Sequence, residues 1–473
     1  MDGRKTIKNI ISVAFSNLAT IIAGVIIGFI IPKVLPVEGY GYYKTFTLYI
    51  NYIGLFSLGI IDGIVLDYGG KDYSEFDKSF FRSIFMWYLL VHAVWLCIFI
   101  FLSIIFDDRN YSFIIFMIGI YMLFANVVGF FQQISQITQR FKEYSKAKVI
   151  QSLMKTLGGL IMIGIYVMSK QLVDFKIYIV LTTIGFATVA VGYVVIYRQI
   201  VFGKADRLRS TKKNVLHFAK IGFPLLFANL CGTLILSLDR QFVNILFSNN
   251  EYAIYAFAYN MMSLVTVATS AVSTVLYPLL KRTSVENLKH KFNAHLSAFL
   301  VFASSTLVLF YPLCAFVTWF LPKYHNSLVI FRIIFPGIAL SSSISVVMHN
   351  YYKAIGKNII YFKNSLIILV LSAVANVLAY YLYRTTYSIS IASIFTILIW
   401  YCVSEQFFVK EYGYNRWNNL FYAISIMTAF YVFTSFNNLY FSLLLYLIAF
   451  LLITFVFQKA FVLEIYQKIT NKK

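Results

Sequence analysis

Residues 83–106 read SIFMWYLLVHAVWLCIFIFLSIIF and lie between Arg82 and Asp107. The stretch contains no Lys, Arg, Asp or Glu, and a helix needs about 20 mostly apolar residues to cross the hydrocarbon core of a bilayer. Its apolar residues follow one another without the alternation that is typical of a barrel strand. The stretch therefore predicts a membrane-spanning α-helix.

The composition of the whole chain agrees with this stretch. Of the 473 residues, 60% are apolar and 12% are charged, whereas soluble domains are about 45–50% apolar and about 25% charged. This balance excludes a water-soluble globular enzyme. Lys and Arg number 40 against 18 Asp and Glu, and they fall between apolar runs, where they predict orientation in a membrane instead of nucleic-acid binding.

Apolar stretches of this length predict an all-α polytopic membrane protein with about 14 transmembrane helices. The predicted spans are roughly 10–31, 45–66, 83–106, 112–134, 149–169, 176–197, 221–247, 253–278, 294–320, 328–349, 364–384, 388–408, 419–436 and 439–460. No segment between them is long enough to form a domain of its own, so we expect the function to lie within the bilayer.

The basic residues predict the orientation of these spans. With a cytoplasmic N-terminus, 30 Lys and Arg fall on the cytoplasmic side, 8 fall outside, and Lys155 and Arg240 are embedded. This asymmetry places both termini in the cytoplasm. The apolar run from Ile10 to Ile31 exceeds the 7–15 residues of a signal-peptide core and lacks an A-x-A site, so the first helix is predicted to be retained.

Two parts of the chain resemble each other at a shared offset. FSN at 15–17 is matched by FAN at 227–229, and EGYGY at 38–42 is matched by EYAIY at 251–255. A repeated unit with an even number of crossings keeps its orientation in the membrane. The offset therefore predicts two copies of one six-helix unit.

The predicted domain organisation follows from this repeat. An N-terminal six-helix bundle occupies 1–215, and a second six-helix bundle occupies 216–408. The two are related by a pseudo-twofold axis along the membrane normal. Residues 409–473 add two transmembrane helices and a cytoplasmic tail.

Short segments spread over residues 1–410 form a further pattern. They are PKVLP at 32–36, EGYGYY at 38–43, SLGIIDG at 57–63, SLDR at 237–240, EYAIY at 251–255, AIGK at 354–357, NVL at 376–378 and YY at 380–381. The pattern resembles the polysaccharide transporter family, the Wzx-type flippases of the MATE-like superfamily. The Gly that the family has after Glu251 is replaced here by Ala253 or Ile254, which is a departure from the pattern.

The resemblance implies a flippase and not an enzyme. Such a flippase moves undecaprenyl-pyrophosphate-linked oligosaccharide repeat units from the inner to the outer leaflet of the bacterial inner membrane, by alternating access, for O-antigen or another surface polysaccharide. The implied partners are this lipid-linked oligosaccharide, membrane lipids and the polysaccharide polymerase machinery, without nucleic acid. No cofactor is expected, and a coupling ion, H⁺ or Na⁺, is left open.

Two other functions are alternatives. A cation-coupled MATE-type exporter of small molecules would need acidic residues clustered deep in the spans, where only Asp62, Asp239 and Glu405 are available. A membrane polysaccharide polymerase or ligase would need catalytic residues gathered in a sizeable outward loop, and the predicted loops are short. We therefore expect the flippase.

Asp239 and Arg240 are the most prominent candidate site residues, because a charged side chain inside a span costs about 2.5–3.5 kcal/mol on insertion scales. A guanidinium group offers paired donors that suit a pyrophosphate or an acidic sugar. Arg240 is accordingly predicted to face a central cavity and bind the anionic part of the substrate. The alternative is a structural contact of Arg240 with Asp62, Glu405 or a backbone carbonyl.

Four further residues are candidates for substrate binding. Lys155 is placed to receive the pyrophosphate from the inner leaflet, or else its ammonium group snorkels to the interface. Asp62 shares with Asp239 the alternative role of carrying a coupling proton. Asn17 and Asn229, at equivalent places in the two repeats, suit hydrogen bonds to sugar hydroxyls or between helices.

Aromatic residues near the ends of spans are predicted to form an interfacial belt. Trp and Tyr are enriched where a membrane meets water. Tyr40, Tyr42 and Tyr43 follow the first span, and Trp319 ends the ninth. We expect these four side chains at the outer interface.

Overall fold

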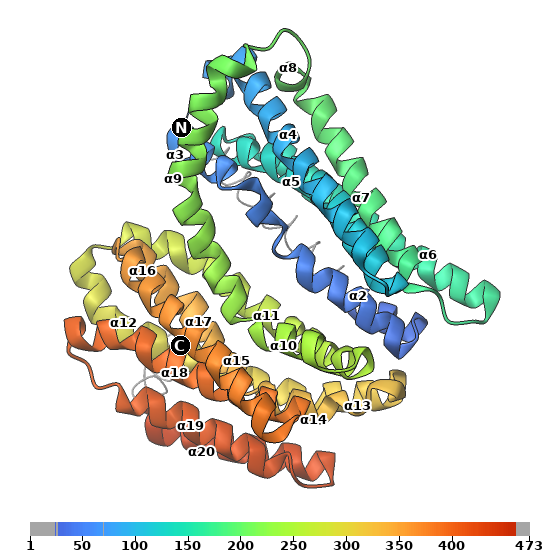
Figure 1. Cartoon of the computed structure of the whole chain (residues 1–473). Helices are drawn as coiled ribbons and strands as arrows, with labels where there is room; N and C mark the ends of the chain where they lie inside the picture. The colour runs from blue at the N-terminus through green and yellow to red at the C-terminus, as the bar shows by residue number, and fades with distance from the viewer. Residues whose placement is uncertain (1–23, 25–26, 70, 460–473) are drawn as a thin grey trace, which may run out of the picture. The chain divides into compact units, whose positions relative to one another are not determined.

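The computed structural model describes residues 24, 27–69 and 71–459. Within this part of the chain every regular element is helical, as the sequence predicts, and there is no strand (Figure 1). The predicted first span at 10–31 lies largely outside the described residues, and its described end at 27–34 is helical.

The chain divides into two compact units, residues 1–233 and 234–473. The domain boundary predicted between 215 and 216 falls inside a helix, α9 (Leu208–Ile235). The last two helices of the chain belong to the second unit, because they pack on its other helices.

The described helices of unit 1 form hairpins of long antiparallel rods. They are α2 (Val37–Ile50), η1 (Ile53–Ser57), α3 (Ile60–Tyr68), η2 (Tyr73–Glu75), α4 (Lys78–Ile105), α5 (Arg109–Ile137), α6 (Phe141–Ser169), α7 (Phe175–Ile196), α8 (Arg198–Val201) and α9. Helix α5 packs on α2, α4 and α7, and α6 packs on α7. Thus α5 lies at the centre of the packing in unit 1.

Unit 2 contains more and shorter elements. They are α10 (Leu238–Leu246), α11 (Asn249–Arg282), α12 (Val285–Ser305), η3 (Thr306–Leu309), α13 (Phe310–Phe320), η4 (Pro322–Tyr324), α14 (Ser327–Ile334), α15 (Gly337–Ser342), the π-helical η5 (Ser343–Met348), α16 (His349–Ala354), α17 (Asn358–Tyr383), α18 (Thr386–Tyr412), α19 (Trp417–Phe433) and α20 (Leu439–Phe457). Helices α14 and α15 both pack on α18, and α19 packs on α20.

The same helix pairings occur in both units, which is what an internal repeat requires. In unit 1, α2 packs on α5, α5 on α7, and α6 on α7. In unit 2 the helices at the corresponding places in the repeat pair in the same way: α11 with α14, α14 with α18, and α17 with α18.

The predicted number of 14 spans is not confirmed. Among the described residues, 9 helices are long and apolar enough to cross a membrane, or up to 11 if each bent pair is one span. Helices α11 and α19 lie at the predicted spans 253–278 and 419–436 but are not among these. Helix α19 has only 17 residues.

Three of the predicted spans are interrupted in the structure. The predicted span 45–66 bends by 57° before α3, and the span 328–349 bends by 48° before α15. The span 221–247 is divided into α9 and α10. A hydropathy window registers the composition of a segment but not its backbone angles, so it does not locate these breaks.

The break between η1 and α3 in unit 1 follows from the local backbone and is stabilised by polar contacts. Leu58 and Gly59 both have a left-handed backbone, with φ of 52° and 78°, which ends η1 and redirects the chain. Asn126 on α5 donates from Nδ2 to the carbonyl of Ile53 at 3.0 Å and to Nε2 of His92 at 2.8 Å. The first bond satisfies a carbonyl at the break, as a membrane interior requires, and the second orients the Asn126 side chain.

Helices α3 and α9 approach each other through glycines. A Cβ atom added at Gly222 would lie 2.0 Å from the carbonyl oxygen of Gly59 and 2.3 Å from the backbone nitrogen of Gly63. A Cβ atom at Gly63 would lie 2.1 Å from the carbonyl oxygen of Phe218. Only residues without a side chain allow this backbone-to-backbone contact.

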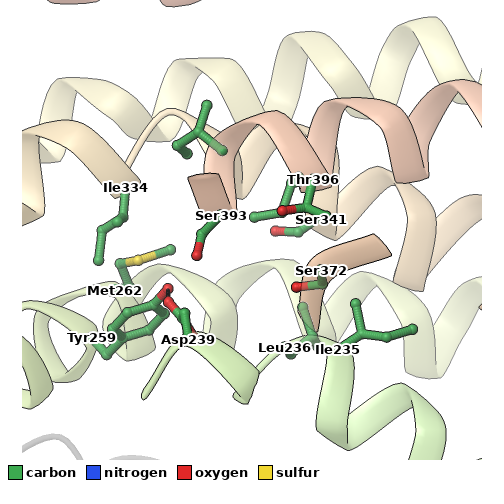
Figure 2. A pocket seen from close by; sticks show the side chains of 12 residues that line it. Ile235, Leu236, Asp239, Tyr259, Met262, Ile334, Ser341, Ser372, Ser393 and Thr396 are labelled. Carbon is green, nitrogen blue, oxygen red and sulfur yellow. Dashed lines mark hydrogen bonds between the residues drawn. The ribbon is translucent and has the colours of Figure 1, made fainter. Parts of the chain in front are cut away.

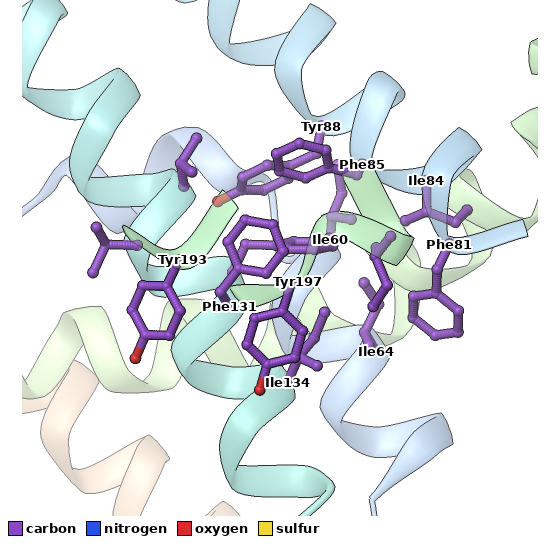
Figure 3. Packing of buried hydrophobic residues seen from close by; sticks show 14 of the residues in the cluster. Ile60, Ile64, Phe81, Ile84, Phe85, Tyr88, Phe131, Ile134, Tyr193 and Tyr197 are labelled. Carbon is purple, nitrogen blue, oxygen red and sulfur yellow. The ribbon is translucent and has the colours of Figure 1, made fainter. Parts of the chain in front are cut away.

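The interior of unit 1 is an aromatic and aliphatic cluster (Figure 3). Phe131 stacks on Tyr197 with ring centroids 5.2 Å apart, and Phe85 contacts Phe131 at 5.1 Å. Ile60 and Ile64 join the cluster from α3. These large side chains bury their apolar surfaces against one another and so pack α3, α4, α5 and α7 together.

The prediction of an interfacial belt is wrong for three of its four members. Tyr40, Tyr42 and Tyr43 are buried, with exposed fractions of 1%, 7% and 9%. They lie inside α2, where Tyr42 stacks on Phe175 at 5.1 Å. Trp319 is 78% exposed. Helix α2 begins earlier than the predicted span, so its tyrosines pack against neighbouring helices.

The start of α4 illustrates how the sequence sets a helix boundary. Asp77 precedes the helix, and its carboxylate accepts hydrogen bonds from the backbone nitrogens of Ser79 at 2.9 Å and Phe80 at 3.3 Å. Hydrogen bonds from the Ser79 side chain and from these backbone groups lower the pKa of Asp77. A carboxylate at this position satisfies donors that no helical carbonyl can reach.

Candidate functional site

A small pocket in unit 2 contains a buried carboxylate (Figure 2). It is lined by Ile235, Leu236, Asp239, Tyr259, Met262, Ile334, Ser341, Ser372, Ser393, Ile394, Thr396 and Ile397. In Figure 2 the hydroxyl groups of Ser341, Ser393 and Thr396 lie across the pocket from Asp239. The pocket therefore faces one carboxylate with several neutral oxygens, inside an apolar shell.

Asp239 is held by three donors. Its side chain is almost fully buried, with an exposed fraction of 4%. Oδ2 accepts hydrogen bonds from the hydroxyl of Tyr255 at 2.7 Å and from the hydroxyl of Tyr259, while Oδ1 accepts from the backbone nitrogen of Arg240 at 2.8 Å. These donors replace water that the carboxylate loses on burial.

The local sequence explains why these groups meet. The chain leaves α9 at Ile235 and enters α10 at Leu238, so Asp239 lies in the first turn of α10, where acidic side chains are stabilised by unpaired backbone N–H groups. Tyr255 and Tyr259 are four residues apart on α11, which places both hydroxyls on one helix face.

Arg240 does not line this pocket. Its Nη2 donates to the carbonyl of Leu236 at 2.7 Å, and its guanidinium carbon lies 4.6 Å from the centroid of the Tyr259 ring. The backbone-carbonyl contact, one of the alternatives foreseen from the sequence, is therefore present. Nε of Arg240 is buried and has no hydrogen-bond partner among the described residues, so this donor is unsatisfied in the conformation described.

Glu405, another predicted partner of Arg240, has different neighbours. It is fully buried on α18 and accepts a hydrogen bond from the hydroxyl of Tyr414 at 2.9 Å. Its Oε2 lies 3.9 Å from Nε of Arg416. Glu405 thus anchors the loop between α18 and α19.

The other predicted site residues belong to unit 1. Lys155 lies exposed on α6, with Nζ 4.0 Å from where a Cβ atom on Gly24 would be. Asp62 is partly buried in the first turn of α3, and Asn229 is exposed on α9. Asn17 lies outside the described residues. Of the predicted residues, the structure brings together only Asp239 and Arg240.

Sequence reasoning missed the hydroxyl groups of the pocket. They come from Tyr259, Ser341, Ser372, Ser393 and Thr396, and Tyr255 adds a hydroxyl that donates to Asp239. The spacing of Tyr255 and Tyr259 within the predicted span 253–278 was a usable signal, since two buried hydroxyls on one helix face need a partner. The serines carried no such signal, because single hydroxyls in a span usually bond to their own helix.

No metal centre is formed by His, Cys, Asp and Glu within the part of the chain that the structure describes, because no three of these residues gather there. The pocket contributes one carboxylate only. Its chemistry is that of a single negative charge surrounded by hydroxyl oxygens.

Comparison with protein-family models gives one match. A family model described as polysaccharide biosynthesis protein matches residues 6–284. A search of curated proteins gives no match.

The fold is similar to those of solved transporters. The lipid II flippase MurJ in an inward closed conformation has a TM-score of 0.71 at 14% identity, covering 96% of this chain and 100% of that chain. An inward-facing multidrug resistance MATE family transporter of the MOP superfamily has a TM-score of 0.58 at 12% identity, covering 84% and 94%. A MATE transporter from Vibrio cholerae has a TM-score of 0.58 at 14% identity, covering 86% and 96%. The chain therefore has the MurJ- and MATE-like fold of a multi-pass membrane protein.

Proposed function

Because this chain belongs to the polysaccharide biosynthesis protein family, we propose that it is a flippase for a lipid-linked oligosaccharide. The observation that carries the proposal is the similarity to the MurJ fold over 96% of this chain, combined with the family match.

The proposed substrate is an undecaprenyl-pyrophosphate-linked repeat unit of O-antigen or another surface polysaccharide. Its polyprenyl tail stays in the hydrocarbon, because each CH₂ moved into water costs about 0.8 kcal/mol. The polar head crosses from the inner to the outer leaflet of the bacterial inner membrane by alternating access. Both termini are cytoplasmic in this proposal, and a polymerase on the outer side consumes the product.

Arg240 is proposed to bind the anionic part of the head group. Its Nε is a buried donor without a partner among the described residues, and leaving such a donor unsatisfied is unfavourable. Lys155, Asp62, Asn17 and Asn229 are proposed as further contacts along the path.

Asp239 is proposed to carry a coupling cation, H⁺ or Na⁺. Its pocket has a volume of about 50 Å³. Sites for organic ligands enclose about 300–1,000 Å³, whereas a cavity needs about 10–15 Å³ to hold one water molecule. The volume favours a small ion with water over a sugar ring.

The test of the main proposal is the Arg240→Ala variant. We expect surface polysaccharide assembly to fall about tenfold or more, because a hydrogen bond to a charged group contributes about 1.5–3 kcal/mol. Assembly is measured in cells that depend on this protein, with its membrane level quantified. The matched control is Arg384→Ala, which removes an exposed arginine from the same unit.

Full assembly by Arg240→Ala at a normal membrane level would show that Arg240 does not bind substrate. The rival function, export of small cationic compounds, is separated by measuring dye efflux in the same cells. Efflux without movement of lipid-linked oligosaccharide would replace the flippase proposal with the exporter.

A further inference from the structure

A strongly basic segment of unit 1 runs from α8 into the first turns of α9. Its basic residues are Arg198, Lys204, Arg207, Arg209, Lys212, Lys213 and Lys220. All seven are exposed, and none forms an ion pair within the part of the chain that the structure describes. The acid in this segment, Asp206, accepts a hydrogen bond from Oγ of Ser79 at 2.7 Å.

The segment is fixed to the rest of unit 1 by one face of α9. Thr211, Val215 and Phe218 are buried, with exposed fractions of 3%, 7% and 3%. Their spacing of four and three residues places them on a single helix face. Oγ1 of Thr211 lies 2.6 Å from Oγ of Ser83, and Nε1 of Trp87 donates to the carbonyl of Leu208 at 3.0 Å.

The opposite face of α9 combines positive charge with an exposed apolar side chain. Arg209, Lys213, Leu216 and Lys220 follow one another at intervals of four, three and four residues, and Lys212 lies beside them. Leu216 is 59% exposed. We call these five residues the basic stripe of α9. Because these residues stand on a helix whose other face is already packed, little backbone ordering is needed before the stripe can bind a ligand.

The location of the stripe identifies the class of ligand. Helix α9 is itself one of the helices that are apolar and long enough to cross a membrane, and the stripe occupies its N-terminal part. The stripe therefore lies where the chain enters the bilayer. Lysines around an exposed leucine match a layer in which phosphates lie directly above acyl chains, whereas a soluble polyanion offers nothing to the leucine.

We propose that the basic stripe of α9 binds the head groups of anionic phospholipids in the leaflet where α9 enters the membrane. Arg209, Lys212, Lys213 and Lys220 contact the phosphates, and Leu216 lies among the upper acyl carbons. This interaction does not depend on which substrate the protein transports. It places unit 1 at a defined depth in the membrane.

The experiment measures lipid selectivity of the full-length protein in phosphatidylcholine bilayers. Trace spin-labelled phosphatidylglycerol or spin-labelled phosphatidylcholine is added, and the motionally restricted fraction of each is compared. The triple variant Arg209→Gln, Lys212→Gln, Lys213→Gln is expected to lose about fivefold or more of the preference for phosphatidylglycerol, since one basic residue near an anionic surface contributes about fivefold. The preference of the unaltered protein is expected to fall with added salt.

Two matched variants make the result specific. Lys281→Gln, Lys289→Gln, Lys291→Gln removes the same charge from exposed positions of unit 2 and is expected to keep the preference. Arg209→Lys, Lys212→Arg, Lys213→Arg keeps the charge and is expected to behave like the unaltered protein. An unchanged preference in the first triple variant, or an equal loss in the unit 2 variant, would overturn the proposal.

Discussion

The interiors of the two units differ in chemistry although their helices pair in the same way. Unit 1 encloses the aromatic cluster around Phe131 and Tyr197 (Figure 3), whereas unit 2 encloses Asp239 and a set of hydroxyl groups (Figure 2). The repeat preserves packing, because packing depends on apolar faces at the same positions. It does not preserve the buried charge.

Individual positions show how the difference arises. At the offset that matches Glu38 with Glu251, Tyr259 corresponds to Phe46, and Asp239 corresponds to Ile26. Phe46 is fully buried against Tyr121 at 5.5 Å, so a ring without a hydroxyl suffices there. A buried carboxylate needs donors, and the tyrosine at 259 provides one.

The largest expected effect is a loss of stability in unit 1, where α3 and α9 pack backbone against backbone. Gly222→Ala would place a methyl group against the backbone of Gly59 and Gly63, and such overpacking costs about 1–3 kcal/mol or more. We expect a lower unfolding temperature and lower yield in a thermal-shift measurement. Gly192→Ala is the control, since no neighbouring atom of the described residues lies within 4 Å of a Cβ atom there. Equal stability of the two variants would contradict the observed contact between α3 and α9.

The next largest effect is expected for Asp239→Asn in unit 2. The amide keeps the shape but removes the charge, so stimulation of transport by an imposed H⁺ or Na⁺ gradient should disappear, a loss of about tenfold or more. Transport is measured in proteoliposomes with and without each gradient. Glu411→Gln, which alters an exposed acid of the same unit, should leave the stimulation intact. Gradient dependence that survives in Asp239→Asn would show that the ion is carried elsewhere.

A smaller loss of transport is expected for Tyr259→Phe, which gives unit 2 the phenylalanine that unit 1 has at the corresponding position, Phe46. The variant removes one donor to Asp239 but keeps the ring beside Arg240. A single hydrogen bond to a charged group contributes about 1.5–3 kcal/mol, so transport should fall less than in Asp239→Asn. Tyr381→Phe serves as the control, because Tyr381 is 70% exposed. If the two phenylalanine variants transport equally well, the hydroxyl of Tyr259 does not support the site.

Much of the fold was predictable from hydropathy. Helices occur at all predicted spans within the described residues, because a membrane interior forces the backbone of an apolar segment to hydrogen-bond within itself. The breaks were not predictable in this way. The left-handed backbone of Leu58, for example, is a property of the assembled break and of the contact between Asn126 and Ile53.

The candidate site was predicted in part. Asp239 and Arg240 stood out because charge in a span is costly, and both lie at the pocket or beside it. Their relative roles were not evident from sequence. Asp239 lines the pocket, while Arg240 turns to the carbonyl of Leu236, since two adjacent helical residues point in different directions.

The sequence by itself determined that this chain is a helical membrane protein built on a repeat, because the hydropathy of each segment and the offset between matching segments can be read without knowing how the helices pack. Only the tertiary structure decided which polar groups meet. Ser372 and Ser393 come from α17 and α18 and share a pocket with Asp239. Side chains so far apart in the chain become neighbours only when the helices pack, and no local sequence pattern predicts which of them will meet.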